Sequence, residues 1–311
     1  MDELLGGIRR LTFPLPLGIR HVHCYLLPGD DGWTLVDTGL GLPDAAARWE
    51  PVLRELDAPI TRIAVTHFHP DHAGGGADAK VLTGAHVLQG AHDYEQCVRV
   101  WGSEDWSERL ATYLCAHGLP EAVAAELRHE SHTFAPFIRF ARGPEPLREG
   151  DDVDGWRVLE LPGHADGHIC LLRDGVLVAG DHLLGVITPT VGLYPESRPD
   201  PLGDYQASLR RTIELAPRVA LPGHGEPVSD PAGRARALLE HHASRLDETA
   251  AALGVEPRSA YDVSLVLFGT NLDANNRRFA LAETLSHLER LVALDRARRV
   301  EDGRTVSYTA A

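Results

Sequence analysis

Three histidines and one aspartate fall within a short stretch of this chain, directly after the apolar run Ile63 to Val65. The members of this cluster are His67, His69, Asp71 and His72. Neutral imidazole and carboxylate groups are the usual protein ligands of zinc and of similar divalent metals. A polar surface loop is the alternative interpretation, because the chain is rich in histidine, with 17 in 311 residues. The specific spacing of the cluster, and the further histidines and aspartates that follow downstream, favour a metal site.

The local geometry expected for this stretch would divide its side chains between two directions. If the apolar run is a strand that extends past its sheet, His67 and His69 share one face, because side chains alternate with a period of two. Pro70 then fixes the backbone and opens a helix, so that Asp71 and His72 point from its first turn towards another side. One such turn is able to serve two metal ions.

Charge and cysteine content narrow the class of protein. The net charge of −15 repels polyanions, which disfavours a general nucleic-acid binder and an anionic membrane surface. No apolar stretch approaches the length of a membrane span, and no basic segment followed by an apolar run opens the chain. The four cysteines show no CxxC spacing, so we expect buried free thiols in a reducing compartment. These features predict a cytoplasmic enzyme.

Short apolar runs alternate with helical patterns over much of the chain, which predicts a layered α/β architecture. We expect strands over 22–27 and 33–36, joined by a hairpin, and again over 60–66 and 81–88, with helices over 42–56 and 91–100. From residue 151 the chain reads as β again, with apolar runs over 153–161 and 169–179, the second with a turn at Arg173 to Gly175. A helix over 205–215 and a strand over 218–221 follow.

Several of these expected strands end in His or Asp beside glycine, and open α/β layers place their sites where strands end. The residues concerned are Asp37, His164, His168, Asp181, His182 and His224. Asp37 is either a turn former or a support for a metal-bound histidine. His168 and His182 are expected to support neighbouring ligands through hydrogen bonds.

Two segments depart from the alternation. Residues 101–135 predict helices inserted between sheet elements, which would form core, a dimer contact or part of a substrate pocket. The region 232–311 predicts a long helix, two further helices and a hairpin across Glu301 to Arg304, the outline of a winged helix. We therefore expect a large α/β domain that carries the metal turn over 1–231 and a small C-terminal helical, winged-helix-like domain over 232–311, with a homodimer as the expected assembly.

Taken in order, the chain contains THFHPDH, then His164 in PGHADGH, Asp181 in AGDH and His224 in PGHG. This ordered pattern resembles the metallo-β-lactamase-fold hydrolase superfamily over most of residues 10–230, including the VDTG turn that ends at Gly39. The resemblance implies an αββα sandwich with a metal site at one edge of the two sheets. It also implies two divalent metal ions, with zinc favoured over iron and manganese.

The ligand assignment follows from the same resemblance, residue by residue. It implies that His67, His69 and His164 hold one metal, that Asp71, His72 and His224 hold the other, and that Asp181 bridges both. Asp37 would support a ligand. With an aspartate at the bridging position, the pattern resembles that of the glyoxalase II-like thioesterases, the lactonases and the RNA-processing members. The C-terminal segment resembles a β-lactamase-like protein group whose members are linked to RNA cleavage and to thioester hydrolysis.

The sequence therefore predicts a hydrolase with two metals that attacks a small acyl substrate, a thioester or lactone-like ester, with a bridging hydroxide. Asp71 and Asp181 are the expected catalytic carboxylates. Tyr194 follows a Gly-Leu turn, and it would either polarise the substrate carbonyl, as in lactonase-like members, or belong to the core. The alternatives are a single-strand endoribonuclease of the same fold and a binding or regulatory protein with residual activity.

Overall fold

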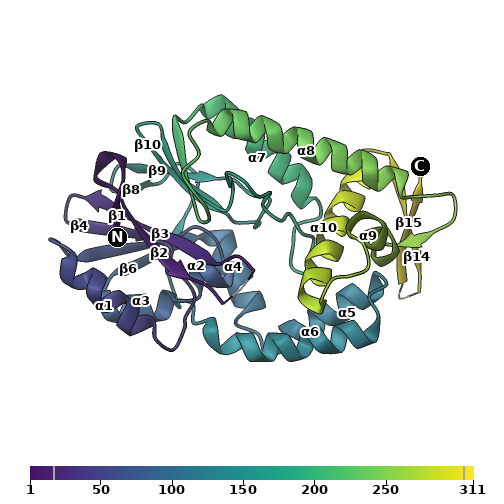
Figure 1. Ribbon diagram of the computed structural model, residues 1–311, viewed down its shortest axis with the longest axis horizontal. Helices are drawn as coiled ribbons and strands as arrows, with labels where there is room; N and C mark the ends of the chain where they lie inside the picture. The colour runs from purple at the N-terminus through teal and green to yellow at the C-terminus, as the bar shows by residue number, and fades with distance from the viewer. Residues whose placement is uncertain (17, 304) are drawn as a thin grey trace.

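Two β-sheets face each other in this computed structural model, and helices cover the outer face of each sheet (Figure 1). The structure describes residues 1–16, 18–303 and 305–311. This four-layer arrangement confirms the predicted αββα sandwich. A further region, containing the C-terminus, lies at the opposite end of the molecule from the N-terminal sheet (Figure 1).

The first sheet follows the order of the chain. Its strands are β1 (Asp2–Glu3), β2 (Arg9–Pro14), β3 (His21–Gly29), β4 (Gly32–Val36), β5 (Ile60–Val65), β6 (His86–Gly90) and β7 (Glu145–Leu147). The pairs from β1 to β4 are antiparallel and those from β4 to β7 are parallel. Because β4, β5 and β6 run in the same direction, their carboxyl ends meet at one edge of the sheet.

The second sheet has the order β12, β11, β10, β9, β8. These strands are β8 (Asp152–Val153), β9 (Trp156–Glu160), β10 (Ile169–Arg173), β11 (Val176–Gly180) and β12 (Val219–Pro222). Buried side chains from both sheets form a common core, which includes Tyr25 and Ala64 from the first sheet and Trp156 and Leu171 from the second. The two sheets are therefore fixed against each other by apolar burial.

Helices cover the two outer faces. The first sheet packs against α1 (Ala45–Glu55), α3 (Gly76–Thr83) and α4 (Ala91–Val100), and the second packs against α7 (Pro201–Leu215) and α8 (Pro231–Ala251). Both α7 and α8 begin with Asp-Pro, and the side chains of Asp200 and Asp230 accept the backbone N–H of Gly203 and Gly233 as N-caps. Proline at the first helical position and an aspartate cap are favoured helix starts.

Two predicted elements are wrong in part. The expected β run over 153–161 is interrupted by a turn at Asp154 and Gly155, which separates β8 from β9. Residues 81–88 were expected to form a strand, but Val81 to Thr83 end α3, and β6 begins only at His86. Val81 is 83% exposed, so this apolar residue lies on the solvent face of a short helix. A short apolar pair cannot distinguish a helix end from a strand start, because periodicity needs a longer window.

The cysteines agree with the sequence prediction at three of four positions. All four are free, and Cys24, Cys97 and Cys170 are buried, whereas Cys115 is half-buried. Among the described residues, none of the helices combines the length and the apolar character needed to cross a membrane.

The insertion forms α5 (Trp106–Ala116), α6 (Glu121–Phe134) and the short helix η2 (Ala135–Phe137). The C-terminal region continues from α8 through β13 (Arg258–Ser259), α9 (Ala260–Phe268), α10 (Ala274–Ala293), β14 (Ala297–Asp302) and β15 (Thr305–Ala310). The last strands form a small sheet in the order β13, β15, β14. The predicted hairpin falls in this sheet, except that Arg304 at its turn lies outside the described residues.

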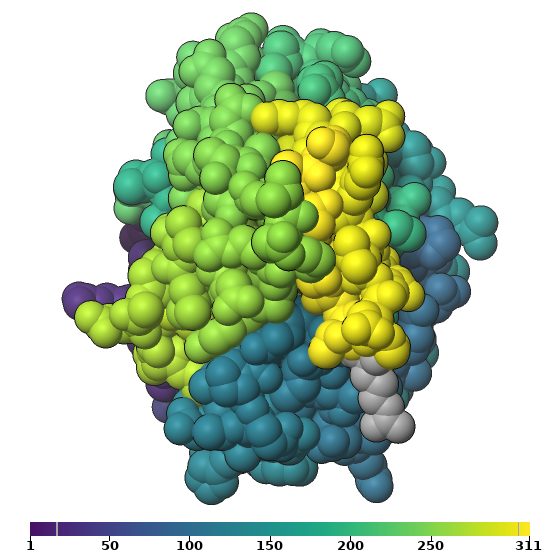
Figure 2. Space-filling view, turned by 90° about the vertical axis from the view of Figure 1, so that its right-hand side faces the viewer, coloured from purple at the N-terminus to yellow at the C-terminus, as the bar shows by residue number. Residues whose placement is uncertain are grey.

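The insertion and the C-terminal region share one apolar core. Leu110 and Leu114 of α5 pack in the same cluster as Leu281 and Leu285 of α10 and Tyr308 of β15. Figure 2 shows this contact from outside, with the helices α5 and α6 in blue lying directly beneath the green and yellow C-terminal elements. The predicted boundary at residue 231 therefore stays a prediction, because apolar contacts join segments on either side of it.

Two buried histidines in this region face each other. Nδ1 of His242 in α8 lies 3.3 Å from Nε2 of His287 in α10, and both side chains are buried. Burial lowers the pKa of His242 to about 3 and that of His287 to about 4. Both rings are therefore neutral in the folded protein at neutral pH.

We expect this pair to weaken the protein in acid. The folded-state pKa values lie below the unfolded value of about 6.5, so the unfolded chain binds more protons, and stability falls as the pH falls from about 6.5 towards 4. His287→Gln should reduce the loss of unfolding free energy between about pH 7.5 and pH 5.5 by about 1 kcal/mol. Urea unfolding at the two pH values measures this, with exposed His129→Gln as the control. The same loss in wild type and His287→Gln would contradict the expectation.

Candidate metal centre

The predicted metal turn lies between β5 and the short helix α2 (Pro70–Ala73). The strand ends at Val65, and Pro70 stands at the first position of the helix. Nε2 of His67 lies 3.0 Å from Nδ1 of His69, which places the two ring nitrogens beside each other. The extended strand end and the proline helix start produce this local geometry, as the spacing predicted.

Side chains from distant strand ends converge on this turn. They form three overlapping groups, and within each group the potential ligand atoms all lie within 4.8 Å of one another. The groups are His67, His69 and His164; His67, His72 and Asp181; and Asp71, His72 and His224. We name His67, His69 and His164 the first ligand set, and Asp71, His72 and His224 the second ligand set. The structure thus brings all seven predicted ligands together.

Asp181, at the end of β11, lies between these two sets. One of its carboxylate oxygens, Oδ1, is 3.4 Å from Nε2 of His72. The other, Oδ2, is 3.7 Å from Nε2 of His164 and 3.3 Å from Nε2 of His224. A single carboxylate therefore adjoins ligands of both sets.

His164 and His224 turn Nε2 towards this centre and bind the protein with Nδ1. Nδ1 of His164 donates to the carbonyl oxygen of Thr190 at 2.7 Å, and Nδ1 of His224 donates to that of His21 at 2.6 Å. Such contacts fix the tautomer and the orientation of a metal-binding imidazole. A backbone carbonyl carries no side-chain signal, so sequence reasoning missed both Thr190 and His21.

Asp37 supports ligands of both sets. Its Oδ2 accepts the Nδ1–H of His72 at 2.8 Å, and its Oδ1 accepts the backbone N–H of Thr66 at 2.8 Å. The Thr66 hydroxyl donates to Asp37 at 2.8 Å and lies 3.0 Å from Nδ1 of His67, which can donate to it. Asp37 also has a positive φ of 61°, a conformation that costs energy outside glycine and is concentrated at functional sites.

We expect Asp37→Ala to weaken metal binding by about 10–100-fold, the usual effect of removing a group that orients a ligand. The substitution leaves the buried donors of His72 and Thr66 without their acceptor. Titration of the metal-free protein with Zn²⁺ against a chelating dye measures the affinity. Exposed Asp31→Ala is the control, and equal affinities for the two variants would refute this role of Asp37.

Burial keeps the rings of the first ligand set neutral. It lowers the pKa of His67 well below the usual value for histidine, lowers that of His69 to about 3, and lowers that of His164 as well. Neutral imidazole is the form that binds a metal, so this set is ready to bind without losing protons.

The second ligand set differs because carboxylates surround its histidines. Burial acts to lower the pKa of His224, but Asp181 and Asp71 outweigh it and raise the value to about 10. Burial likewise acts on His72, whose pKa is nevertheless raised well above its usual value by Asp181, Asp37 and Asp71. The carboxylates thus attract positive charge to this position, where a divalent cation would displace the ring protons.

The donor set fits a metal on a second, independent ground. Nε2 of His72, His164 and His224 and Oδ1 of Asp181 are buried atoms without a hydrogen-bond partner within the described ranges. Buried polar atoms are almost always satisfied, so four unsatisfied ones pointing to one place indicate a ligand there. Gly223 allows this convergence, since a Cβ at that position would lie 2.5 Å from both Asp181 Oδ1 and His72 Cε1.

The two histidines predicted to support ligands differ in position. Nε2 of His168 accepts the backbone N–H of Asp181 at 3.2 Å, and its ring stacks on His67 with 4.8 Å between centroids. His182 instead turns towards α7, where its Nε2 lies 2.8 Å from the hydroxyl of Thr212. His168 thus contacts the metal centre directly, whereas the ring of His182 points to a helix.

Tyr194 packs with the insertion and the C-terminal region. Its ring belongs to the edge of the apolar cluster formed by α5, α6 and α10, and burial raises its pKa. The role in polarising a substrate carbonyl therefore stays a prediction.

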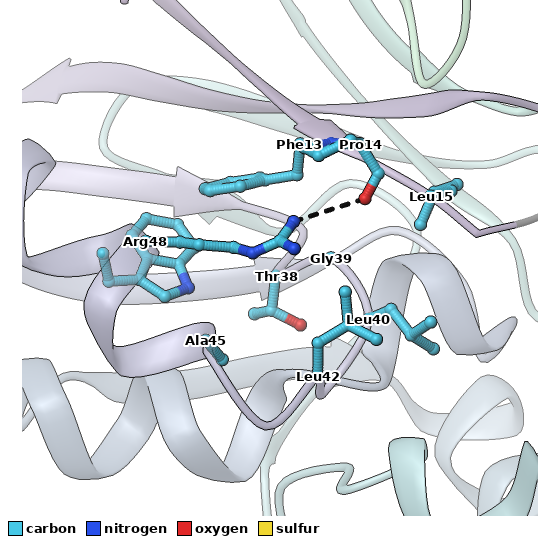
Figure 3. A pocket seen from close by; sticks show the side chains of 10 residues that line it. Phe13, Pro14, Leu15, Thr38, Gly39, Leu40, Leu42, Ala45 and Arg48 are labelled. Carbon is cyan, nitrogen blue, oxygen red and sulfur yellow. Dashed lines mark hydrogen bonds between the residues drawn. The ribbon is translucent and has the colours of Figure 1, made fainter.

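A small pocket near the metal turn is lined by residues other than the predicted metal ligands. Figure 3 shows Phe13, Thr38, Leu42 and Arg48 around it, and the Arg48 guanidinium donates to the carbonyl oxygen of Pro14 at 3.4 Å. None of the metal-ligand side chains lines this pocket. We therefore assign it no part in the chemistry.

Comparison with known proteins agrees with this geometry. Residues 17–224 match the family model described as metallo-beta-lactamase superfamily, and residues 246–311 match the model described as metallo-beta-lactamase-like, C-terminal domain. The chain therefore belongs to the metallo-beta-lactamase superfamily.

Individual relatives match most of the chain. A crystal structure of a metallo-beta-lactamase family protein from Thermus thermophilus is 36% identical, has a TM-score of 0.84 and covers 99% of each chain. A probable metallo-hydrolase, YqjP of Bacillus subtilis, is 28% identical over 96% of this chain and 96% of its own. An atrochrysone carboxyl ACP thioesterase of Claviceps purpurea is 23% identical over 84% of this chain and 71% of its own. The chain is thus a metal-dependent hydrolase.

Proposed function

We propose that the hydrolase is dinuclear and that Asp181 serves both ligand sets. The observation that carries this proposal is the position of the Asp181 carboxylate, 3.7 Å from His164 of the first set and 3.4 and 3.3 Å from His72 and His224 of the second. A carboxylate between two ligand sets suits a pair of divalent cations, because its two oxygens are able to face both ions and its negative charge offsets part of theirs.

The two ligand sets would each hold one cation. Divalent ions at these positions supply Lewis acidity, which lowers the pKa of water and stabilises the negative charge that develops on an acyl or phosphoryl group. Zinc is the favoured ion because imidazole and carboxylate suit it, while iron and manganese accept the same ligands.

Asp71 is the chain's own candidate for moving a proton. Its side chain is 16% exposed, against 8% for Asp181, so it is the more accessible of the two carboxylates to water and substrate. Burial acts to raise the pKa of Asp71, but His72 and His224 outweigh it and lower the value. An ionised carboxylate at this place would accept a proton at Oδ2 when water attacks the substrate.

A small acyl substrate, with a thioester as the first choice, suits the chain best. The fungal relative named as an acyl carrier protein thioesterase supports a thioester, and it matches most of this chain. A lactone-like ester is the neighbouring choice, since both substrates present an acyl carbon to attack. Tyr194 would then donate a hydrogen bond to the acyl oxygen, and Tyr194→Phe tests that role.

The C-terminal region gives little support to a nuclease. In a winged-helix protein that reads a duplex, the recognition helix enters a groove and exposes one face. The corresponding helix here is α10, the last helix before the terminal hairpin, and more than half of its residues are buried. Arg277 of this helix is itself buried, and Arg290 pairs with Asp200. We propose a winged-helix-like module that serves packing.

A panel of substrates tests the proposal. The metal-loaded protein should hydrolyse short acyl thioesters, with slower turnover of lactones and none of single-stranded RNA. Turnover should be lost in Asp181→Ala and kept in its control, Asp154→Ala. Asp154 is also a largely buried carboxylate, but it pairs with Arg62 away from the metal turn. Cleavage of single-stranded RNA without turnover of thioesters or lactones would overturn the substrate class.

A further inference from the structure

The peptide groups on either side of Phe68 are both bound by side chains from one helix. Phe68 stands between the ligands His67 and His69. Its backbone N–H donates to Oδ1 of Asp93 at 2.9 Å, and its carbonyl oxygen accepts the indole N–H of Trp101 at 2.8 Å. Asp93 lies in the first turn of α4, and Trp101 is the residue that caps its C-terminus.

These two contacts control the relative position of the ligand rings. The peptide N–H of Phe68 belongs to the bond with His67, and its carbonyl belongs to the bond with His69. Nε2 of His67 and Nδ1 of His69 lie 3.0 Å apart, and rotation of either peptide group would move one of these rings relative to the other. A hydrogen bond on each side opposes both rotations.

The Asp93 carboxylate is itself held in place. It is fully buried, and its second oxygen, Oδ2, accepts the side-chain amide of Gln89 in β6 at 2.6 Å. A buried carboxyl group with a donor at each oxygen has little freedom to move. Asp93 thus ties the metal turn to the neighbouring strand as well as to the helix.

The same helix contacts the loop that carries His164. A Cβ on Gly167, three residues after this ligand, would lie only 2.2 Å from the backbone nitrogen of Asp93, so loop and helix are in direct contact. Gln96 of α4 also donates to Asp166 in this loop, at 3.4 Å. Helix α4 therefore touches the segments that hold every member of the first ligand set.

We propose that Asp93 and Trp101 are positioning residues that set the geometry of the first ligand set, His67, His69 and His164. This inference rests on the metal site proposed above. The second ligand set takes its support from Asp37 and from the His21 carbonyl. We call the hydrogen bonds of Asp93 and Trp101 to the Phe68 backbone the clamp. Its loss should weaken binding of one metal ion and spare the other.

Two matched pairs of variants test the clamp. Asp93→Leu removes both acceptors, whereas Asp93→Asn keeps one acceptor for Phe68 and can pair with Gln89 after its amide turns over. Trp101→Phe removes the indole donor, and Trp156→Phe is its control, because the buried Trp156 indole nitrogen has no hydrogen-bond partner among the described residues. The probe is Co²⁺, added to the metal-free full-length protein and followed by its visible absorption.

We expect the wild type to bind two Co²⁺ ions. In Asp93→Leu and Trp101→Phe one of them should bind about 10–100-fold more weakly, with an altered absorption band. Asp93→Asn and Trp156→Phe should retain the wild-type affinity and spectrum. Circular dichroism of each variant checks its fold, and where Asp93→Leu does not fold, the Trp101→Phe and Trp156→Phe pair decides.

The possible results distinguish failure of the clamp from failure of the two-metal site on which it rests. Wild-type affinity and spectrum in Trp101→Phe, and in a folded Asp93→Leu, would overturn the clamp while leaving the two-metal site intact. A wild-type protein that binds a single Co²⁺ ion would overturn the two-metal proposal, and the clamp is then judged by the affinity of the variants for that ion.

Discussion

Asp181→Ala is expected to lose one of the two metal ions and to reduce kcat/KM for the best acyl substrate by at least ~10³-fold, equivalent to about 4 kcal/mol of transition-state stabilisation. The reason is geometric, because its carboxylate adjoins His72, His164 and His224. Removing it leaves imidazoles of both sets without the charge that balances the cations. Metal analysis by mass spectrometry and steady-state kinetics measure the two effects.

The control for Asp181→Ala is the largely buried Asp154, in the variant Asp154→Ala. Asp154 pairs with Arg62 at 2.8 Å and accepts the hydroxyl of Thr34 at 2.6 Å, so its loss affects folding and not the metal ligands. Full activity of a folded Asp181→Ala protein would rule out a mechanism in which this carboxylate serves both metals.

Leu285→Ala is expected to destabilise the protein by about 2–5 kcal/mol, the usual range for a buried leucine replaced by alanine. Leu285 of α10 is fully buried in the core that α5 and α6 share with the C-terminal region. Urea unfolding measures the loss of stability. We also expect faster hydrogen exchange in α5, because its leucines lose a packing partner in another part of the chain.

Leu294→Ala provides the comparison, since Leu294 follows α10 and is 41% exposed. Its effect should stay within about 0.5 kcal/mol. If Leu285→Ala destabilised the protein while exchange in α5 remained at the wild-type rate, the shared core would not couple the insertion to the C-terminal region.

The metal turn was predictable from the sequence because its geometry is local. A strand end places His67 and His69 on one side, and Pro70 at the helix start turns the chain within a few residues. His164, Asp181 and His224 follow the ends of strands that lie far apart in the chain. Their place beside glycine at expected strand ends indicated a site, and the ordered pattern of a family assigned them to the metal. The comparisons confirm that family.

The residues that hold the ligands were mostly not predictable. Thr190 and His21 act through backbone carbonyls, which every residue possesses. Asp93 carried a weak signal, as a carboxylate in the first turn of an expected helix, a position that is usually exposed and favourable for the helix dipole. Its complete burial depends on the approach of Gly167 from a distant loop, which no local pattern reveals.

Packing between distant segments was likewise not predictable from local patterns. The alternation of strands and helices predicted the αββα layers, but it did not predict that the insertion would share a core with the C-terminal region. Leu114 and Leu285 both belong to that core, and each of them alone reads as an ordinary buried position of a helix. The expected homodimer stays a prediction.

Turnover during metal titration tests the central claim most directly. The metal-free protein is titrated with Zn²⁺ while hydrolysis of an acyl thioester is followed. We predict that activity remains low at one equivalent per chain and reaches its maximum at two, because the two ligand sets act together through Asp181. Full activity at one equivalent, or activity without any metal, would contradict the account.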